Sequence, residues 1–130
     1  MIPRVKRKLL QLARENKPEH KNFRLAAGVV FRRRLICWGV NSYKTHPIMT
    51  AEGYHSEQIF LHAESQAIVR ALRLLAVEEL KQSSLYVVRV RQFANRTGFE
   101  ETLARPCEGC WGLIAQVGFK EVLWTKEKGT

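Results

Sequence analysis

The feature that most restricts the fold of this chain is an alternation of strand-like and helix-like segments along residues 23–124. Two segments with helical spacing of apolar residues, 62–80 and 106–117, each stand between apolar runs typical of strands. The four predicted strands are residues 23–31, 35–40, 85–91 and 119–124. A helix that connects one strand to the next implies a crossover, so the last three strands should run parallel. The pattern therefore predicts an α/β fold.

A further helix is predicted before the first strand. Residues 4–16 carry apolar side chains at helical spacing, with arginine and lysine on the opposite face. The apolar positions are Val5, Leu9, Leu12 and Ala13. Three arginines at 32–34 separate the first two strands and fit a tight hairpin with a charged tip, although no Gly or Asn marks the turn type.

The remaining segments are predicted loops. Residues 41–61 show no apolar period and are long for a connection in a compact domain, and loops of that length are often functional. Residues 92–105 are expected to form a second, polar loop. Pro106 suits the first turn of the helix that follows, and Gly118 is a typical stop signal after it.

Composition limits the classes of protein to consider. The chain has 130 residues, of which 45% are hydrophobic, so we expect one domain over residues 1–130 with a single sizeable core. The formal net charge of +10 indicates an anionic partner such as phosphate or nucleic acid, unless it only aids solubility. No stretch approaches the ~20 apolar residues of a membrane span, so no membrane contact is expected. The basic N-terminus lacks the apolar segment of a secretory signal, which predicts a cytoplasmic protein.

Two short segments at predicted helix starts carry the candidate chemistry: His62-Ala63-Glu64 and Pro106-Cys107-Glu108-Gly109-Cys110. A C-x-x-C pair in a chain without an export signal favours metal or redox use over a disulfide framework. His62, Cys107 and Cys110 make a three-ligand zinc set, which leaves a fourth position for water, as catalytic zinc sites do. The positive end of a helix favours the thiolate form in which cysteine binds metal.

Glu64 stands two residues after His62. From there it cannot easily ligate the same metal, but it can reach a metal-activated water and act first as general base and then as general acid. Two other readings are open. A thioredoxin-like redox pair would need a strand directly before the C-x-x-C. A purely structural zinc site would need a fourth protein ligand, for which His20, His46 and His55 are the other histidines.

These residues resemble a known signature. The order H-x-E and then P-C-x-x-C, each at a helix start with a strand between them, is similar to the zinc-dependent cytidine/deoxycytidylate deaminase superfamily. The runs Gly39-Val40-Asn41, Lys44-Thr45-His46-Pro47 and Leu61-His62-Ala63-Glu64 more narrowly resemble small phage-encoded deoxycytidylate-deaminase-like proteins. The resemblance covers most of the chain. It implies a minimal single domain with three layers, α-β-α, around a mixed sheet of four to five strands.

The resemblance also implies an activity, the hydrolytic deamination of cytosine. Water activated by zinc adds to C4 of the base, and Glu64 carries the proton to N3 and then to the leaving ammonia. In the superfamily an Asn at the end of the second strand contacts the sugar, and Asn41 matches that position. Backbone groups around Ala63 and Pro106 are expected to meet the pyrimidine edge. An Asn at a strand end also has a simpler reading as a turn residue.

Other positions carry weaker expectations. Lys44 and His46 follow Asn41 closely and are candidates for phosphate or base contacts, or else solvated loop residues. Tyr43 stands where cytidine deaminases carry a Glu after the sugar-binding Asn, which weakens the free-nucleoside reading. Cys37 lies on a predicted strand and is expected in the core. Larger deoxycytidylate deaminases often carry extra metal ligands and an allosteric nucleotide site. The sequence has no matching additional Cys/His cluster, so regulation by a nucleoside triphosphate is not expected.

The sequence as a whole predicts a zinc-dependent enzyme that deaminates a cytosine nucleotide, with deoxycytidylate (dCMP) as the substrate. The first alternative is a deaminase of single-stranded DNA or RNA, which the positive charge favours but the lack of interleaved aromatic residues does not. A free cytidine or deoxycytidine deaminase is a second alternative. A non-catalytic zinc-stabilised binding module is the third, although such a module has no need of Glu64. A homo-oligomer is possible because the last strand lies at a sheet edge.

Overall fold

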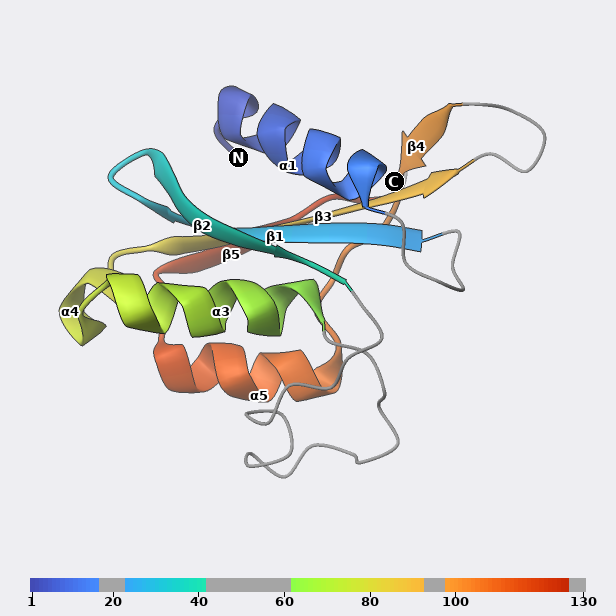
Figure 1. Ribbon diagram of the computed structural model, residues 1–130. Coiled ribbons are helices and arrows are strands. Elements are labelled where there is room, and N and C mark those ends of the chain that lie inside the picture. The colour runs from blue at the N-terminus through green and yellow to red at the C-terminus, as the bar shows by residue number, and fades with distance from the viewer. Residues whose placement is uncertain (17–22, 42–61, 93–97, 127–130) are drawn as a thin grey trace.

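A computed structural model describes residues 1–16, 23–41, 62–92 and 98–126, and Figure 1 shows them as one sheet covered on both faces by helices. The helices are α1 (Pro3–Glu15), α3 (Ala63–Leu74), α4 (Val77–Leu80) and α5 (Glu108–Val117). The strands are β1 (Phe23–Phe31), β2 (Arg34–Val40), β3 (Ser84–Gln92), β4 (Phe99–Glu101) and β5 (Glu121–Trp124). The three layers and the mixed five-stranded sheet confirm the predicted fold class.

The sheet has the order β2-β1-β3, and two short strands share the far side of β3. β1 pairs antiparallel with both β2 and β3, so β2 and β3 run in the same direction. β5 pairs parallel with the first half of β3, and β4 pairs antiparallel with the end of β3. The strands that the sequence predicted to be parallel, β2, β3 and β5, therefore share one direction.

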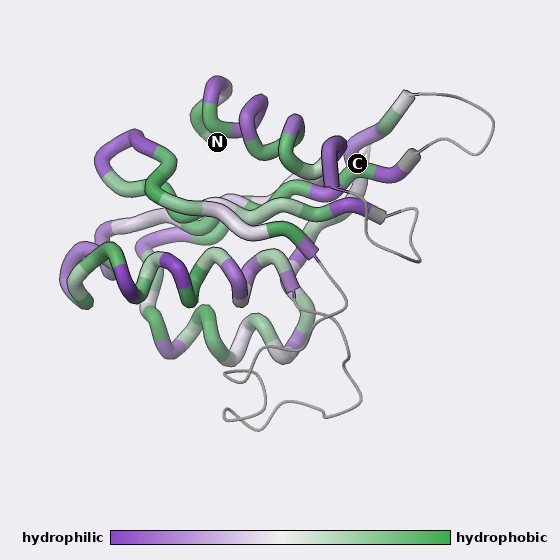
Figure 2. Tube along the Cα trace, viewed as in Figure 1, coloured by the Kyte–Doolittle hydropathy of each residue, from purple (hydrophilic) through white to green (hydrophobic). Residues whose placement is uncertain are grey.

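Two apolar clusters lie on opposite faces of the sheet. On one face, α1 buries Val5, Leu9 and Ala13 against the sheet, while its outer positions are charged. Figure 2 shows this alternation of hydrophobic and hydrophilic residues along α1. On the other face α3 and α5 cover the sheet, and Ile68 and Leu113 are among their buried side chains. Because each sheet face is covered, the strands are apolar on both sides, as the sequence showed.

The predicted hairpin between the first two strands is present. Arg32 and Arg33 form a two-residue turn in which both backbones are left-handed, with φ of 51° and 66°. This conformation suits the right-handed twist of the strands, but Asn and Gly adopt it far more readily than Arg does. The missing turn signal in the sequence therefore reflects a real departure from the usual turn residues.

Two predictions about elements were wrong in part. The helix predicted over 62–80 breaks after Leu74, where Leu75 is extended, and α4 starts anew with the Ala76 N–H donating to the Glu79 carboxylate. The loop predicted over 92–105 contains β4, a strand too short to show a period. Gly118 ends α5 with φ of 76°, as predicted. Among the described residues, no helix is long and apolar enough to cross a membrane.

Candidate active site

The two helix starts singled out in the sequence meet in space. α3 and α5 run side by side in the same direction, so their N-termini lie together at one end of the sheet (Figure 1). His62 is the N-cap of α3 and Cys107 is the N-cap of α5. Cys110 lies in the first turn of α5 and is buried. The ligand atoms of these three residues all lie within 4.8 Å of one another.

The donor set fits zinc. His62 Nδ1 lies 3.3 Å from Cys107 Sγ. Tetrahedral zinc, with bonds of about 2.0 Å to nitrogen and 2.3 Å to sulfur, holds such ligand atoms roughly 3.5–3.8 Å apart, so small shifts would complete the geometry. One imidazole and two thiols are also the mixed nitrogen and sulfur donors that zinc prefers. Three protein donors at this spacing leave room for one further ligand.

The two cysteines have opposite protonation preferences. A hydrogen bond from Cys110 is the main cause that lowers the pKa of Cys107, to about 4, against the opposing effect of burial. The same hydrogen bond, together with burial, raises the pKa of Cys110. Burial by itself would lower the pKa of His62, but the contacts with Cys107 outweigh it and the pKa of His62 is raised. A thiolate is thus already stabilised at Cys107, which is the form that binds metal.

Glu64 is a buried carboxyl group beside the three candidate ligands. Its side chain is only 3% exposed, in the first turn of α3. Burial is the largest cause that raises its pKa, and the opposing interactions with His62 and Cys110 are smaller. A carboxyl group whose pKa is raised by burial binds a proton more readily than a solvated one, and it can exchange that proton with a molecule bound beside it. The site therefore contains a group suited to proton transfer.

Asn41 lies directly after β2, and its orientation is set by α1. The side-chain Oδ1 of Asn41 accepts hydrogen bonds from Asn16 Nδ2 at 2.7 Å and from the Leu25 N–H at 2.9 Å. Asn16, which caps the C-terminus of α1, also donates to the Asn41 carbonyl at 3.0 Å. These bonds fix which edge of the Asn41 amide faces α1. The sequence contained no signal for Asn16, because it lies 25 residues from its partner.

A close approach of two elements sets Asn41 relative to Glu64. Gly39 of β2 packs on the first turn of α3, and a Cβ at that position would lie 2.6 Å from the Ala63 carbonyl oxygen. Gln66 Oε1 accepts from the Val40 N–H at 2.8 Å, which ties the end of β2 to the same helix. The end of β2 and the start of α3 are therefore held together as one unit.

The other predicted site residues have different outcomes. Ala63 and Pro106 are buried at the starts of the two helices, next to the candidate ligands in sequence. Lys44 and His46 lie outside the described residues, so their predicted substrate contacts stay predictions. Cys37 is in the core as expected, with its thiol donating to the Ala67 carbonyl at 3.4 Å.

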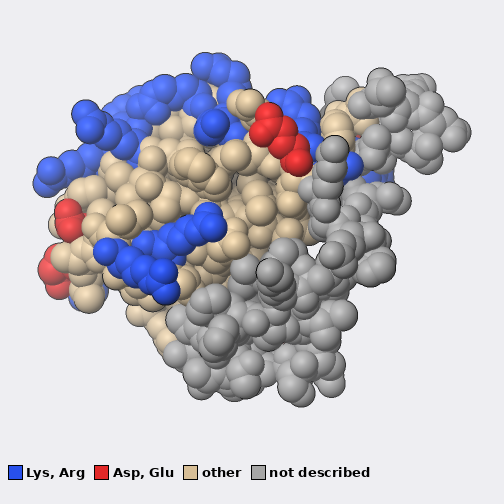
Figure 3. Space-filling view, viewed as in Figure 1, with Lys and Arg blue, Asp and Glu red and all other residues tan. Residues whose placement is uncertain are grey.

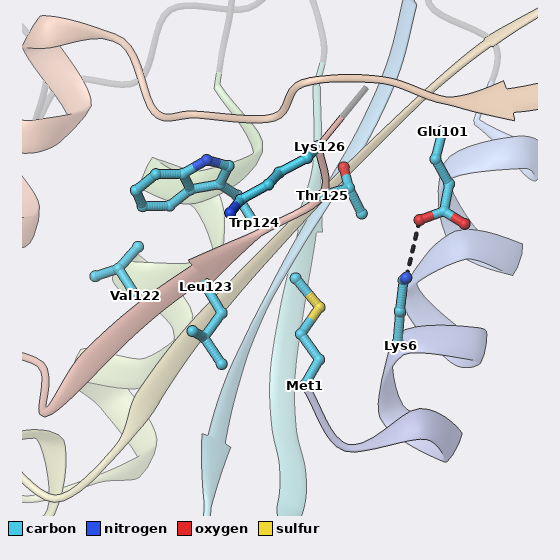
Figure 4. Close-up of a pocket in the computed structure, with 8 residues that line it drawn as sticks. All are labelled: Met1, Lys6, Glu101, Val122, Leu123, Trp124, Thr125 and Lys126. Carbon is cyan, nitrogen blue, oxygen red and sulfur yellow. Dashed lines mark ion pairs between the residues drawn. The ribbon is translucent and has the colours of Figure 1, made fainter. Parts of the chain in front are cut away.

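A cavity of about 560 Å³ lies elsewhere, on the side of the sheet that α1 covers. Figure 4 shows Lys6 and Glu101 at its rim, joined by an ion pair of 2.9 Å, and the side chain of Trp124. None of the three candidate zinc ligands lines this cavity, so it is separate from the candidate active site. Trp124 also packs edge-on against Trp111, with ring centroids 5.9 Å apart.

Comparison with known families decides which group the chain belongs to. Residues 3–126 match the family described as cytidine and deoxycytidylate deaminase zinc-binding region. The chain belongs to this deaminase family. The zinc cofactor predicted from His62, Cys107 and Cys110 is thereby confirmed, because the family's matched region binds zinc and these residues have the geometry to hold an ion.

Solved structures of deaminases share the fold. The dCMP deaminase of the cyanophage S-TIM5 in apo form has a TM-score of 0.61 and 21% identity over 99% of this chain and 88% of that one. The same enzyme in complex with dCMP and dUMP has a TM-score of 0.58 and 20% identity over 95% and 82% of the two chains. At this identity the similarity establishes the fold. No curated protein matches the sequence.

Proposed function

We propose that this protein is a zinc-dependent hydrolase that converts the cytosine of a nucleotide, dCMP, to uracil. The observation that carries the proposal is the buried carboxyl group of Glu64, which lies beside His62, Cys107 and Cys110 at the paired starts of α3 and α5. A zinc site that only stabilised the fold would have no use for a buried acid at this position, since burying it costs free energy. Proton transfer during a reaction gives that acid a role.

His62, Cys107 and Cys110 would hold the ion, and zinc in such a site supplies Lewis acidity that lowers the pKa of water to about 7. Glu64 then takes a proton from the attacking water and delivers it to N3 of the cytosine. After the C4–O bond forms, Glu64 would take the remaining proton of the hydroxyl group added at C4 and pass it to the amino group, so that the C4–N bond breaks, C4=O forms and ammonia leaves. The carboxyl group ends in the state in which it began, as a catalyst must.

Residues around this centre would bind the rest of the nucleotide. Asn41, whose amide is oriented by Asn16, would contact the sugar, while backbone groups near Ala63 and Pro106 would meet the pyrimidine edge. Lys44 and His46 are the proposed contacts to the phosphate. The choice of dCMP is supported by the neighbour of known structure that was solved with dCMP and dUMP. We further propose that the protein works in the cytoplasm, where such nucleotides are found.

The test is a side-by-side assay of ammonia release from dCMP, deoxycytidine, cytidine and a single-stranded oligonucleotide that contains cytosine. We expect dCMP to be deaminated with the highest kcat/KM. Lys44→Ala should raise the KM for dCMP and leave deoxycytidine nearly unchanged, because one phosphate needs only one or two charged contacts. Equal efficiency on dCMP and deoxycytidine would contradict a nucleotide-specific site. Turnover of the oligonucleotide alone would replace dCMP with a polymeric substrate.

A further inference from the structure

Positive charge is segregated along this chain rather than mixed with negative charge. Residues 3–14, 23–41 and 65–77, which supply β1, β2 and most of α1 and α3, contain eleven Lys and Arg and no Asp or Glu, whereas Glu15 and Glu64 lie at the ends of the two helices. A surface that needs only solubility normally intersperses both signs. The segregation therefore needs a second reason, and α1, β2 and α3, three of these four elements, meet at one edge of the sheet.

The edge in question is the free side of β2, which is the terminal strand of the sheet. Figure 3 shows positive side chains in two bands on the face toward the viewer, one along the top over α1 and the β1–β2 turn and one lower, on α3. β2 runs between these bands (Figure 1). We call this surface the cationic edge, and its residues are Arg4, Lys8, Arg33, Arg34, Trp38, Arg70 and Arg73.

Side-chain contacts connect the cationic edge across α1, β2 and α3. The Lys8 ammonium of α1 lies 6.0 Å from the centre of the Trp38 ring on β2. The Arg70 guanidinium of α3 donates to the Trp38 carbonyl at 2.6 Å. At the other end of β2, the Arg4 guanidinium donates to the Arg33 carbonyl at 2.5 Å. Each end of β2 is thus flanked by cations from a neighbouring element.

Trp38 is the apolar centre of this surface. The Trp38 side chain is 37% exposed and belongs to neither of the two apolar clusters that cover the faces of the sheet. An exposed indole with cations around it can stack on a nucleic-acid base while the cations contact the flanking phosphates. A base in a duplex is already stacked and cannot use the ring in this way, so the geometry favours a single strand.

The backbone conformation of the β1–β2 turn indicates that its arginines are present for their charge and not for the stability of the turn. Arg32 and Arg33 both hold left-handed backbone conformations, which cost roughly 1–2 kcal/mol for each residue other than Gly. An Asn-Gly turn would avoid that cost. Two arginines at these positions therefore provide charge at the expense of stability, as expected where the charge binds something.

The backbone of the edge argues against a second β-strand as the occupant. The outward Trp38 carbonyl and the outward Val40 N–H are both already bonded, to Arg70 and Gln66 respectively. Dense positive charge would also repel another copy of this chain. Two of the outward backbone groups are thus occupied, and the positive charge of the edge favours an anionic polymer over a strand of this same basic chain.

We propose that the cationic edge binds single-stranded nucleic acid, with a base stacked on Trp38 and phosphates on the flanking Arg and Lys side chains. The β2 strand is about 20 Å long at ~3.3 Å per residue, enough for a few nucleotides. The strand ends at Val40, directly before Asn41, so the bound nucleic acid would lead toward the candidate active site. The inference goes beyond the deaminase activity, because this binding does not require turnover.

The test measures fluorescence anisotropy of a labelled oligothymidylate of about 12 nucleotides, a length within known single-strand site sizes. The probe contains no cytosine, so it reports binding and not catalysis. We expect binding that weakens steeply with salt, with Arg33→Ala/Arg34→Ala reducing the log–log salt slope by about 1.4. Trp38→Ala should weaken binding about 10- to 100-fold, whereas Trp38→Phe should retain most of it.

Lys126→Ala is the matched control, because it removes one positive charge beyond β5, at the opposite side of the sheet. It should leave oligothymidylate binding nearly unchanged. Saturating dCMP should not displace the oligonucleotide, and dCMP turnover by Trp38→Ala should stay near that of the parent protein, which separates this proposal from the proposed function. Absence of binding at low salt, duplex binding as tight as single-strand binding, or an equal loss in Lys126→Ala and Trp38→Ala would each overturn the proposal.

Discussion

At the scale of single residues, the candidate site depends on side chains whose environments alter their proton affinity or orientation. Glu64 is buried, Cys107 is stabilised as a thiolate, and Asn41 is held by Asn16. These states come from neighbours both near and far in sequence, since Cys110 is three residues from Cys107 and Asn16 is 25 residues from Asn41. Substitutions at single positions can therefore separate the roles of metal binding, proton transfer and substrate positioning.

Replacing Glu64 with Gln keeps the shape of the side chain but removes its ability to carry a proton. We expect Glu64→Gln to retain one zinc per chain and a parental thermal stability, since it is not among the three candidate ligands. Turnover should fall by at least ~10² to 10⁴-fold, the usual contribution of a general acid–base group. Metal analysis and ammonia release measure the two properties. A near-parental rate would mean that another residue moves the proton.

Asn16 is predicted to act on the substrate only through Asn41. Asn16→Ala removes the donor to Asn41 Oδ1 and should raise the KM for dCMP roughly 2- to 10-fold, which corresponds to the loss of one hydrogen bond. The value of kcat should change little, because Glu64 and the zinc ligands are not in contact with Asn16. Gln11→Ala is the control, since Gln11 bonds only to Glu15 at an exposed position of the same helix. A fall in kcat without a change in KM would contradict the assignment.

Burial of the Cys37 thiol should make the free energy of unfolding fall at alkaline pH. Burial is the main cause that raises the pKa of Cys37, to about 11. The unfolded chain releases this proton near pH 8.5. Between about pH 8.5 and 11 the folded state therefore holds more protons than the unfolded state, and the free energy of unfolding falls as pH rises. Denaturant melts at several pH values should show a shallower fall for Cys37→Ala, and identical slopes would refute this explanation.

At the scale of elements, the site depends on how closely β2 approaches α3. A methyl group at Gly39 would lie 2.6 to 2.8 Å from backbone atoms of Ala63 and Ala67, and backbone cannot move aside as the end of a side chain can. This contact determines the position of Asn41 at the end of β2 relative to Glu64 at the start of α3.

We expect Gly39→Ala to lower the free energy of unfolding by about 1–3 kcal/mol, as overpacking of a core does. It should also lower kcat/KM for dCMP, because β2 must move away from α3. Gly28→Ala is the matched control, since the three atoms nearest to a Cβ there are the ends of the Leu35 and Leu9 side chains, which can shift more easily than backbone. Chemical denaturation of both variants gives the comparison. A larger loss in Gly28→Ala than in Gly39→Ala would show that the close approach is not the limiting contact.

At the scale of the whole molecule, zinc held by the three candidate ligands would join α3 and α5, two helices that are not consecutive in the chain. His62 belongs to the start of α3 and both cysteines to the start of α5. Binding free energy of the metal therefore adds to the stability of the packed pair of helices. Removing the metal should therefore lower the thermal stability of the protein as well as its activity.

We expect one zinc per chain to copurify with the protein. Removal by a chelator should lower Tm and abolish turnover together, and added zinc should restore both. Cys110→Ala should reproduce the loss of metal and of stability, whereas Cys37→Ala should not reproduce the loss of metal. Metal analysis, thermal melts and ammonia release on the same samples provide the test. Active protein without zinc would contradict the proposed function.

The sequence by itself determined the elements whose signals are local. Apolar periodicity identified α1, β1 and β2 within a residue or two, and Gly118 marked the end of α5, because these patterns depend only on residues a few positions apart. The short motifs His62-Ala63-Glu64 and Cys107-Glu108-Gly109-Cys110 were likewise visible as local patterns and gave the candidate metal ligands. Sequence patterns were sufficient for those elements that are determined by interactions between residues close together in the chain.

Only the tertiary structure decided the rest. β4 has three residues and is a strand because it pairs with the end of β3, and α3 ends at Leu74 because the chain must turn back into the sheet. The bonds of Asn16 to Asn41 and of Lys8 and Arg70 to Trp38 join segments separated by 25 to 32 residues. No sequence period relates such residues. They meet because two faces of one sheet must each be covered, and the free energy of that burial fixes which side chains become neighbours.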